Sequence, residues 1–317
     1  MHIRTVLLVL LLCCPLSAAR AAGLSLLEVP AGGDGAALTG AVWSPCAAPA
    51  ETVKLRRIEV PGVRDCPVEG EGLALIVISH GAFGWFGGHH DTAAALADAG
   101  YVVAAITHPD DYTRRWRTDR PAAVKRVIDH MLGAWSGRAK LDPERIGFFG
   151  FSRGGYTGLV AVGGVPDFRL AGKHCRKVPS DPLCRLSPKT PPAGGTAPSY
   201  THDPRIKAAV IAAPLGIVFS ADGLKRVTAP VQLWRLENDE LASHHNAHAV
   251  RDALPVKPEY HVVPDAGHFA ILAPCTEPQA RAVPKFCKDA GGFDRVAFHK
   301  DFNARIAAFF EVHLAGP

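Results

Sequence analysis

The sequence predicts a doubly wound α/β fold, in which helices cover both faces of a mostly parallel sheet. Two observations lead to this prediction: short, continuous apolar runs recur along the chain, and helical patterns lie between them. A strand that is covered on both faces has no polar side, so an uninterrupted apolar run is typical of a parallel strand. Regular alternation of such runs with helices indicates a parallel sheet.

The predicted strands begin with Leu24–Val29 and Ala36–Trp43, which look like leading antiparallel strands. Parallel strands are expected at the apolar runs Leu73–Ser79, Tyr101–Ile106, Arg145–Phe149, Ile206–Ala212, Val231–Leu236 and Tyr260–Val263. Among the helical patterns between them, Pro121–Trp135 has Asp119 near its start and its proline at a first-turn position, where a missing N–H is tolerated. The other predicted helices are Asp91–Ala99, Arg153–Val162, His244–Leu254 and a last helix whose apolar face holds Phe302, Ile306, Phe309 and Phe310.

Residues 166–204 break this alternation. They are rich in Pro, Gly and Ser and contain Cys175 and Cys184. We interpret them as a small disulfide-containing insertion that is either a lid or a disordered surface loop. The remainder of residues 22–317 is expected to form a single domain.

The first 21 residues are interpreted as a secretory signal peptide. Arg4 gives a positive start, Val6–Leu12 is a short apolar run, and Ala19-Arg20-Ala21 has the small-x-small pattern of a cleavage site. The apolar run is too short to span a bilayer, so no stable membrane anchor is expected. The mature protein is expected in the periplasm or the medium, which the sequence does not distinguish.

Six cysteines follow the signal peptide, and an even number in a secreted chain predicts disulfides. They form three couples of near neighbours, so spacing alone favours sequential pairing, and the connectivity stays open. None has the Cys-x2-Cys form of a zinc knuckle. These cysteines are Cys46, Cys66, Cys175, Cys184, Cys275 and Cys287.

The segment Gly150-Phe-Ser152-Arg-Gly154 joins a predicted strand to a predicted helix. A serine in such a Gly-x-Ser-x-Gly turn projects its hydroxyl above the sheet edge, and the glycines stand where close packing would exclude a β-carbon. We expect Ser152 to be a nucleophile rather than a structural turn serine. A serine hydroxyl needs a general base, and His268, in a short loop after the last predicted strand, is the expected base.

An acid should orient this histidine from the end of an earlier strand. Three carboxylates follow Leu236 there: Asp239 is the preferred acid, Glu237 is the alternative, and Glu240 is interpreted as a solvated charge. Backbone N–H groups of Ala82 and Arg153 are the expected oxyanion donors. The aromatic residues Phe83, Trp85, Phe86 and Phe151 flank the expected site and either line an acyl pocket or pack a loop onto the core.

Other clusters of histidine and of charged residues are weaker indications of a binding site. His89-His90-Asp91 and His244-His245-x-x-His248 could offer metal ligands, but neither has the glutamate of a His-Glu-x-x-His zinc site, so no metal or organic cofactor is expected. Arg114, Arg115 and Arg117 could hold an anionic group, although a solvated loop is favoured. The formal charge of +5 is not gathered into a Lys/Arg run, which argues against nucleic-acid binding.

Several motifs together resemble the α/β-hydrolase superfamily, over roughly residues 50 to 315. They are similar, more narrowly, to bacterial secreted proteins called predicted dienelactone hydrolases, which are similar in turn to platelet-activating-factor acetylhydrolases of the plasma type. Ser, Asp and His also follow one another in the order of α/β-hydrolases. True dienelactone hydrolases use a cysteine nucleophile, and this chain has Ser152, so the group name does not indicate the substrate. The motifs include Ser79-His-Gly-Ala, His108-Pro-Asp, Gly150-Phe-Ser-Arg-Gly, Asp203-Pro-Arg-Ile and Ala266-Gly-His-Phe.

The resemblance implies a Ser-Asp-His esterase that needs no cofactor and acts on a small-molecule ester. Two alternatives stay open: a non-catalytic binding protein on a hydrolase fold, and an amidase or other acyl-transfer enzyme. The sequence does not identify the acyl chain, the alcohol or the oligomeric state.

Overall fold

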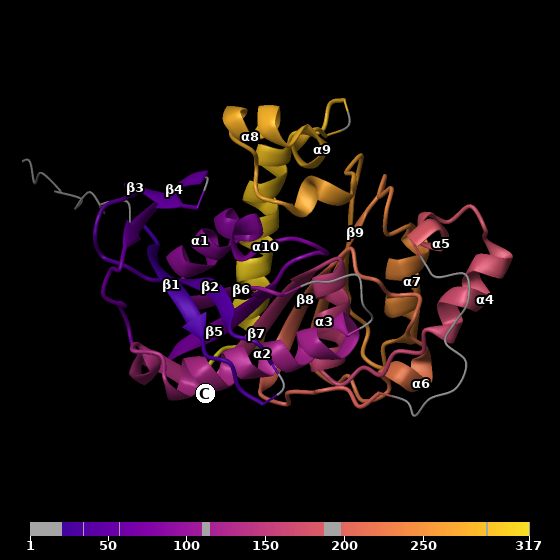
Figure 1. The fold of residues 1–317 in the computed structure, drawn as a ribbon, viewed down its shortest axis with the longest axis horizontal. Helices are drawn as coiled ribbons and strands as arrows, with labels where there is room; N and C mark the ends of the chain where they lie inside the picture. Colours follow the sequence, from indigo (N-terminus) through magenta and orange to yellow (C-terminus); the bar gives the residue numbers. More distant parts are fainter. Residues whose placement is uncertain are drawn as a thin grey trace, which may run out of the picture.

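A mixed sheet, ten-stranded within the described residues, runs through the centre of the molecule in the order β10-β9-β8-β7-β5-β6-β2-β1-β4-β3 (Figure 1). The computed structural model describes residues 21–33, 35–56, 58–109, 115–186, 198–289 and 291–316. The strands are β1 Gly23–Val29, β2 Leu38–Ser44, β3 Glu51–Leu55, β4 Ile58–Arg64, β5 Leu73–Ser79, β6 Val102–Thr107, β7 Leu141–Phe151, β8 Ile206–Ala212, β9 Val231–Leu236 and β10 Glu259–Val263.

The predicted α/β fold with a mostly parallel sheet is confirmed. Neighbouring strands from β10 to β6 are all parallel, and β2 is antiparallel to both β6 and β1, as expected for the leading strands. The β3–β4 hairpin was not predicted, and it extends the sheet because Gly23 and Leu24 of β1 pair with β4.

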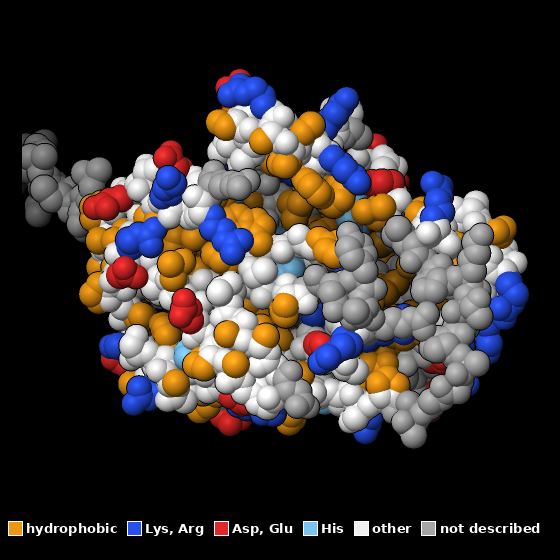
Figure 2. Space-filling view, viewed as in Figure 1, with side chains coloured by type: hydrophobic (Ala, Val, Ile, Leu, Met, Phe, Trp, Pro, Cys, Tyr) orange, Lys and Arg blue, Asp and Glu red, His pale blue; other side chains and the backbone are white. Residues whose placement is uncertain are grey.

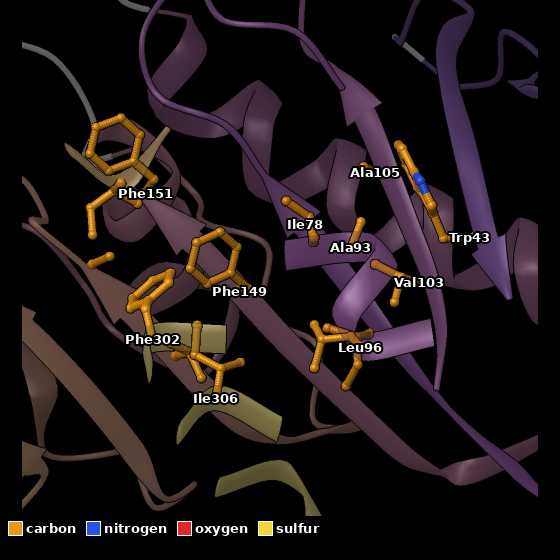
Figure 3. Close-up of a cluster of buried hydrophobic side chains, with 14 of the residues drawn as sticks. Trp43, Ile78, Ala93, Leu96, Val103, Ala105, Phe149, Phe151, Phe302 and Ile306 are labelled. Atoms are coloured by element: carbon orange, nitrogen blue, oxygen red, sulfur yellow. The ribbon is translucent and has the colours of Figure 1, made fainter. Parts of the chain in front are cut away.

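Helices cover both faces of the sheet and separate the interior into two apolar layers. On one face, α1 (His90–Asp98) and α10 (Arg295–His313) pack against alternate residues of β5, β6 and β7 (Figure 3). On the other face, α2 (Trp116–Gly133), α3 (Arg153–Ala161) and α7 (His244–Ala253) bury the intervening residues. Because successive strand residues point to opposite faces, the apolar runs fill both layers.

The remaining helices of the described residues are short. The α-helices among them are α4 Arg169–Lys177, α5 Pro182–Leu186, α6 Ala221–Leu224, α8 Glu277–Ala282 and α9 Pro284–Cys287. The 3-10 turns are η1 Phe86–His89, η2 Arg138–Lys140 and η3 His268–Ile271. The insertion at 166–204 is therefore helical at α4 and α5; its residues 187–197 lie outside the described residues.

The expected start of the helix at Pro121 is wrong, since α2 begins at Trp116 and places this proline inside the helix. A proline has no N–H for the carbonyl four residues before it, which here belongs to Arg117. The Tyr156 hydroxyl donates to that carbonyl oxygen at 3.3 Å. A tertiary hydrogen bond thus replaces the lost helical one, and local sequence could not indicate it.

All six cysteines form disulfides, in the sequential pairs that spacing favoured: Cys46–Cys66, Cys175–Cys184 and Cys275–Cys287. Disulfides persist in oxidising, extracellular-type compartments. The predicted signal peptide, apart from Ala21, lies outside the described residues. Among the residues that are described, no helix is both long and apolar enough to cross a membrane.

Candidate active site

The candidate site lies where the winding of the sheet reverses. From β5 the chain crosses to β6 on one side, and it then returns to form β7 on the other side of β5. Ligands of open α/β sheets bind outside the carboxyl ends of the strands at such a switch point. Ser152 follows β7 and Gly81 follows β5; a β-carbon on Gly81 would lie 3.5 Å from the Ser152 β-carbon. The two strand ends therefore meet at Ser152.

Ser152 occupies a strained turn. Its backbone has φ 56° and ψ −113°, a region that residues with a side chain adopt at a cost of about 1–3 kcal/mol. Its N–H donates to the Ala212 carbonyl oxygen at 2.8 Å. The predicted need for small residues is confirmed, because a β-carbon on Gly154 would lie 1.9 Å from the Ser79 carbonyl oxygen, and one on Gly150 would lie 2.3 Å from that of Gly154.

A relay of hydrogen bonds links Ser152 to His268 and Asp239. The Ser152 Oγ lies 3.0 Å from His268 Nε2, and His268 Nδ1 lies 2.8 Å from Asp239 Oδ2. The His268 and Asp239 side chains are only 4% and 2% exposed. A carboxylate accepts hydrogen bonds, so Asp239 favours the tautomer with the proton on Nδ1, which leaves Nε2 free to accept the serine proton.

The structure separates the three carboxylates of the loop after β9. Asp239 contacts His268, and its other oxygen accepts the N–H groups of Leu241 and Ala242 at 2.9 and 2.6 Å. Glu237 does not serve the histidine: its carboxylate accepts the Asp265 N–H at 3.2 Å. Glu240 is exposed, yet it is more than a solvated charge, because its Oε2 accepts the backbone N–H of His268 at 2.9 Å.

Arg120, which the sequence reasoning missed, holds the loop after β5. Its guanidinium is buried and donates to the carbonyl oxygens of His80 at 2.8 Å and Gly81 at 3.0 Å. The C=O of Gly81 and the N–H of Ala82 belong to one planar trans peptide unit, so they point in opposite directions. By fixing this carbonyl, Arg120 fixes the direction of the predicted oxyanion donor. The helical pattern of the sequence does not show whether this arginine is buried or exposed to solvent.

The four aromatic pocket candidates lie in different environments. Phe86 is buried in the core, and Phe151 is buried with its ring centre 4.8 Å from that of His268, so both act in packing. Trp85 is partly buried against the core. Phe83 is 56% exposed, and the Arg153 guanidinium lies 5.3 Å from its ring centre. Of the four, Phe83 is thus the one whose side chain is exposed, and it lies near the residue that follows Ser152.

The two described candidates for anion binding, Arg115 and Arg117, have different partners. Arg115, which precedes α2, is exposed and pairs with Asp119 in the first turn of that helix, whereas the Arg117 guanidinium lies 3.4 Å from the Phe168 ring centre. Arg114 lies outside the described residues. On the face shown in Figure 2, Lys and Arg are scattered among Asp and Glu, and hydrophobic side chains gather below α8 and α9.

Polar side chains of η1, α1 and α10 support the segment that carries His268. His299 lies 2.6 Å from an Asp91 carboxylate oxygen through Nδ1 and 2.8 Å from the Ala270 carbonyl oxygen through Nε2. Burial alone would raise the pKa of Asp91, but the His299 hydrogen bond and charge, with smaller contributions from His90 and Asn303, lower it to about 2. His89 lies 3.1 Å from the Ile271 carbonyl oxygen, and burial lowers its pKa to about 4. These side chains position a backbone segment.

The fold and this geometry define an α/β protein with a Ser-His-Asp relay at the switch point of its sheet. No protein-family model matches the chain, and no curated protein was found to match it. Its chemistry is therefore argued from the site.

Proposed function

We propose that the protein is a secreted serine hydrolase that cleaves carboxylic esters. The relay from Ser152 through His268 to Asp239 carries this proposal, because an isolated serine hydroxyl is a poor nucleophile and needs an oriented base. The strained turn at Ser152 supports it, since strain of this kind collects at functional positions. The three disulfides support an oxidising compartment and hence secretion.

The proposed reaction has two halves. Ser152 Oγ attacks the ester carbonyl carbon while His268 Nε2 takes its proton, and Asp239 stabilises the resulting imidazolium. The tetrahedral intermediate then breaks its bond to the alcohol oxygen, which receives the proton from His268 and leaves an acyl group on Ser152. Water, deprotonated by His268, attacks the acyl group, and the acid departs as Ser152 regains its proton.

The negative oxygen of each tetrahedral intermediate needs fixed donors. The Arg153 N–H at the amino end of α3 and the Ala82 N–H after β5 are the proposed pair, since both flank Ser152 at the switch point. Removing one such donor typically lowers kcat by about 10² to 10³-fold. Because Arg120 holds the Gly81 carbonyl, the Ala82 N–H would already point towards the oxyanion before substrate binds.

Membership of the α/β-hydrolase superfamily is part of this proposal. It is supported by the motif resemblance, by the doubly wound sheet, and by the chain order in which the nucleophile, the acid and the base each follow a strand. The kinship to the secreted dienelactone-hydrolase-like group is also proposed. Its name does not extend to the substrate, because the nucleophile here is a serine.

A fluorophosphonate probe tests the proposal, because it labels activated serines. The folded wild-type protein should react with it and hydrolyse p-nitrophenyl esters, and a ladder of acyl lengths would then define the acyl preference. Ser152→Ala should abolish both activities without lowering the melting temperature appreciably. Ser180→Ala, which removes a hydroxyl from an exposed residue, is the matched control and should leave both unchanged.

The outcomes separate the alternatives. A folded Ser152→Ala variant that keeps its ester turnover would show that the nucleophile is wrong. A wild-type protein that neither reacts with the probe nor turns over esters would be a binding protein on this fold. Probe labelling together with a preference for anilides over esters would make it an amidase.

A further inference from the structure

The fold brings together three side chains with metal-binding groups: His174 and Asp181, which are seven residues apart in the insertion, and His245 of α7. One ring nitrogen of His174, one of His245 and a carboxylate oxygen of Asp181 all lie within 4.8 Å of one another. They come from α4, the amino end of α7 and the turn before α5, which cluster at the right of Figure 1. Among the described residues, this is the one group of three or more such side chains that lie close enough together to hold a metal ion.

The cluster is constrained by its surroundings. The Cys175–Cys184 disulfide closes the short segment that carries Asp181 and begins next to His174, so it restricts these two side chains relative to one another. Asp181 is 3% exposed and also accepts hydrogen bonds from the Ser243 hydroxyl at 2.6 Å and the Leu183 N–H at 2.9 Å. Hydrogen bonds of this kind orient metal ligands in known sites.

The spacing suits a small tetrahedral ion. Zinc binds imidazole nitrogen and carboxylate oxygen at about 2.0–2.2 Å, so two ligands on one tetrahedral ion stand roughly 3.3 Å apart. His174 Nε2 and Asp181 Oδ2 lie 2.8 Å apart, and all three atoms lie within 4.8 Å, so these distances bracket the required separation. The pair at 2.8 Å would have to separate by about 0.5 Å, and a pair at the 4.8 Å limit would have to approach by about 1.5 Å.

The geometry points to a zinc site at His174, Asp181 and His245, with water as the fourth ligand. Two imidazoles and one carboxylate favour zinc over calcium or magnesium, which prefer all-oxygen ligands. The sequence predicted no metal because its histidine clusters are local patterns, which do not place His174 beside His245.

Zinc at this site would join the insertion to the loop that carries Asp239. Ser243, which donates to Asp181, directly precedes α7, and Asp239 holds the N–H groups of Leu241 and Ala242 in the same loop. A metal bridge between α4 and α7 would therefore limit motion of both the insertion and this loop. Binding itself would not require an active Ser152.

The test is direct zinc binding by tag-free, EDTA-treated, oxidised protein that lacks residues 1–21, the predicted signal peptide with Cys13 and Cys14. Calorimetric titration should show one zinc ion per chain, and the melting temperature should rise with zinc concentration. Calcium and magnesium should produce neither effect. All six described cysteines are in disulfides, so their thiolates do not compete for zinc.

Variants assign the ligands. His245→Ala and, separately, Asp181→Asn should each weaken zinc binding by more than about 10-fold, since even residues that only hydrogen-bond to metal ligands contribute about 10- to 100-fold. His248→Ala, one turn further along α7, is the matched control and should bind zinc like the wild type. The melting temperature without zinc verifies that each variant is folded.

Two results would overturn the inference. Wild-type protein that binds no zinc at micromolar concentrations would leave these side chains as a hydrogen-bonded cluster that only attaches the insertion. Equal weakening by His248→Ala and His245→Ala would place the ion elsewhere on the histidine-rich end of α7.

Discussion

At the scale of single residues, the loop after β9 gives three similar carboxylates three different tasks. Asp239 orients the His268 ring, Glu240 holds its backbone N–H, and Glu237 binds the neighbouring turn at Asp265. Asp239→Asn should therefore lower kcat by orders of magnitude, because an amide can favour the wrong histidine tautomer; the corresponding change in a serine-protease triad costs about 10⁴-fold. Glu237→Gln should change kcat little.

Ester kinetics of the two variants and the wild type, with melting temperatures, would check this ranking. Similar losses in both variants at unchanged stability would contradict the assignment of Asp239. A larger loss in Glu237→Gln would move the acid to that residue.

Arg120 gives a second prediction at this scale. Lysine cannot donate to the His80 and Gly81 carbonyls with a planar fork, so Arg120→Lys should misalign the Ala82 N–H. We expect kcat to fall by about 10²-fold with KM little changed, since small misplacements of catalytic groups have effects of this size. Arg126→Lys is the matched control, because Arg126 also donates to two carbonyls from α2 but lies away from this loop.

Steady-state kinetics and the rate of fluorophosphonate labelling would separate positioning from stability. A loss of melting temperature with an unchanged kcat would make Arg120 purely structural. Equal catalytic losses in both lysine variants would show that α2 acts on the site in some less specific way.

The sequence predicted Ser152, His268 and Asp239 because each follows a strand in a defined order, and strand ends meet at one edge of the sheet. Arg120 and Glu240 could not be predicted in their roles. Both act on backbone groups that tertiary packing brings close, 39 to 40 residues away for Arg120 and 28 for Glu240. The distinction is physical: strand ends can be located from apolar runs, whereas contacts to a loop's carbonyls depend on its conformation.

At the scale of elements, the buried strands were the most predictable part of the fold. The bounds of β5, β8 and β9 agree with their apolar runs because both faces of each strand are covered. The β3–β4 hairpin was missed because it is short and partly exposed, and it turns at Arg56, which has φ 55° without the freedom of glycine. The usual Asn-Gly signal of a tight hairpin is absent there.

The segment that carries α8 and α9 gives a prediction at this scale. The Cys275–Cys287 disulfide ties it together, and Phe286 packs against Phe269, the residue after His268, with ring centres 4.8 Å apart. Replacing both cysteines with serine should destabilise the protein by roughly 3 kcal/mol, through the freer unfolded chain. We expect turnover to fall as well, because Phe269 would lose part of its support.

Melting temperature and ester turnover well below melting would check both expectations. The matched control replaces Cys46 and Cys66, whose disulfide follows β2 and β4; it should lower stability and leave turnover unchanged. A destabilised Cys275–Cys287 variant with full turnover would keep the structural role of this bond and remove its effect on His268.

At the scale of the whole molecule, the burial of histidines makes the folded protein less stable in acid. His89 is buried between β7 and the η3 segment, and burial lowers its pKa from the ordinary 6.5 to about 4. His108 is also buried, and its pKa lies well below the ordinary value for the same reason, with Arg120 and His80 adding to the effect. In the unfolded chain both histidines would bind protons more readily than in the folded protein, so acid favours unfolding.

Because the pKa of His89 is lower in the folded protein than in the unfolded chain, stability is lost as the pH falls. For His89, the unfolded state binds more protons between pH 6.5 and about 4, so its contribution to stability is present above 6.5 and is lost as the pH falls towards 4. From pH 7.5 to pH 5 this one group should remove about 2 kcal/mol from the free energy of unfolding. Asp91, with a pKa of about 2, should contribute only below its ordinary value of 3.8.

Urea unfolding at a series of pH values would measure this loss. His89→Gln removes the titrating group, so its free energy of unfolding should fall less steeply between pH 6.5 and 4 than that of the wild type, even though the variant is less stable at pH 7.5. His313→Gln replaces an exposed histidine at the end of α10 and should keep the wild-type slope. If His89→Gln keeps the full wild-type slope, the acid sensitivity comes from other groups, with His108 the next candidate because it is buried at the end of β6.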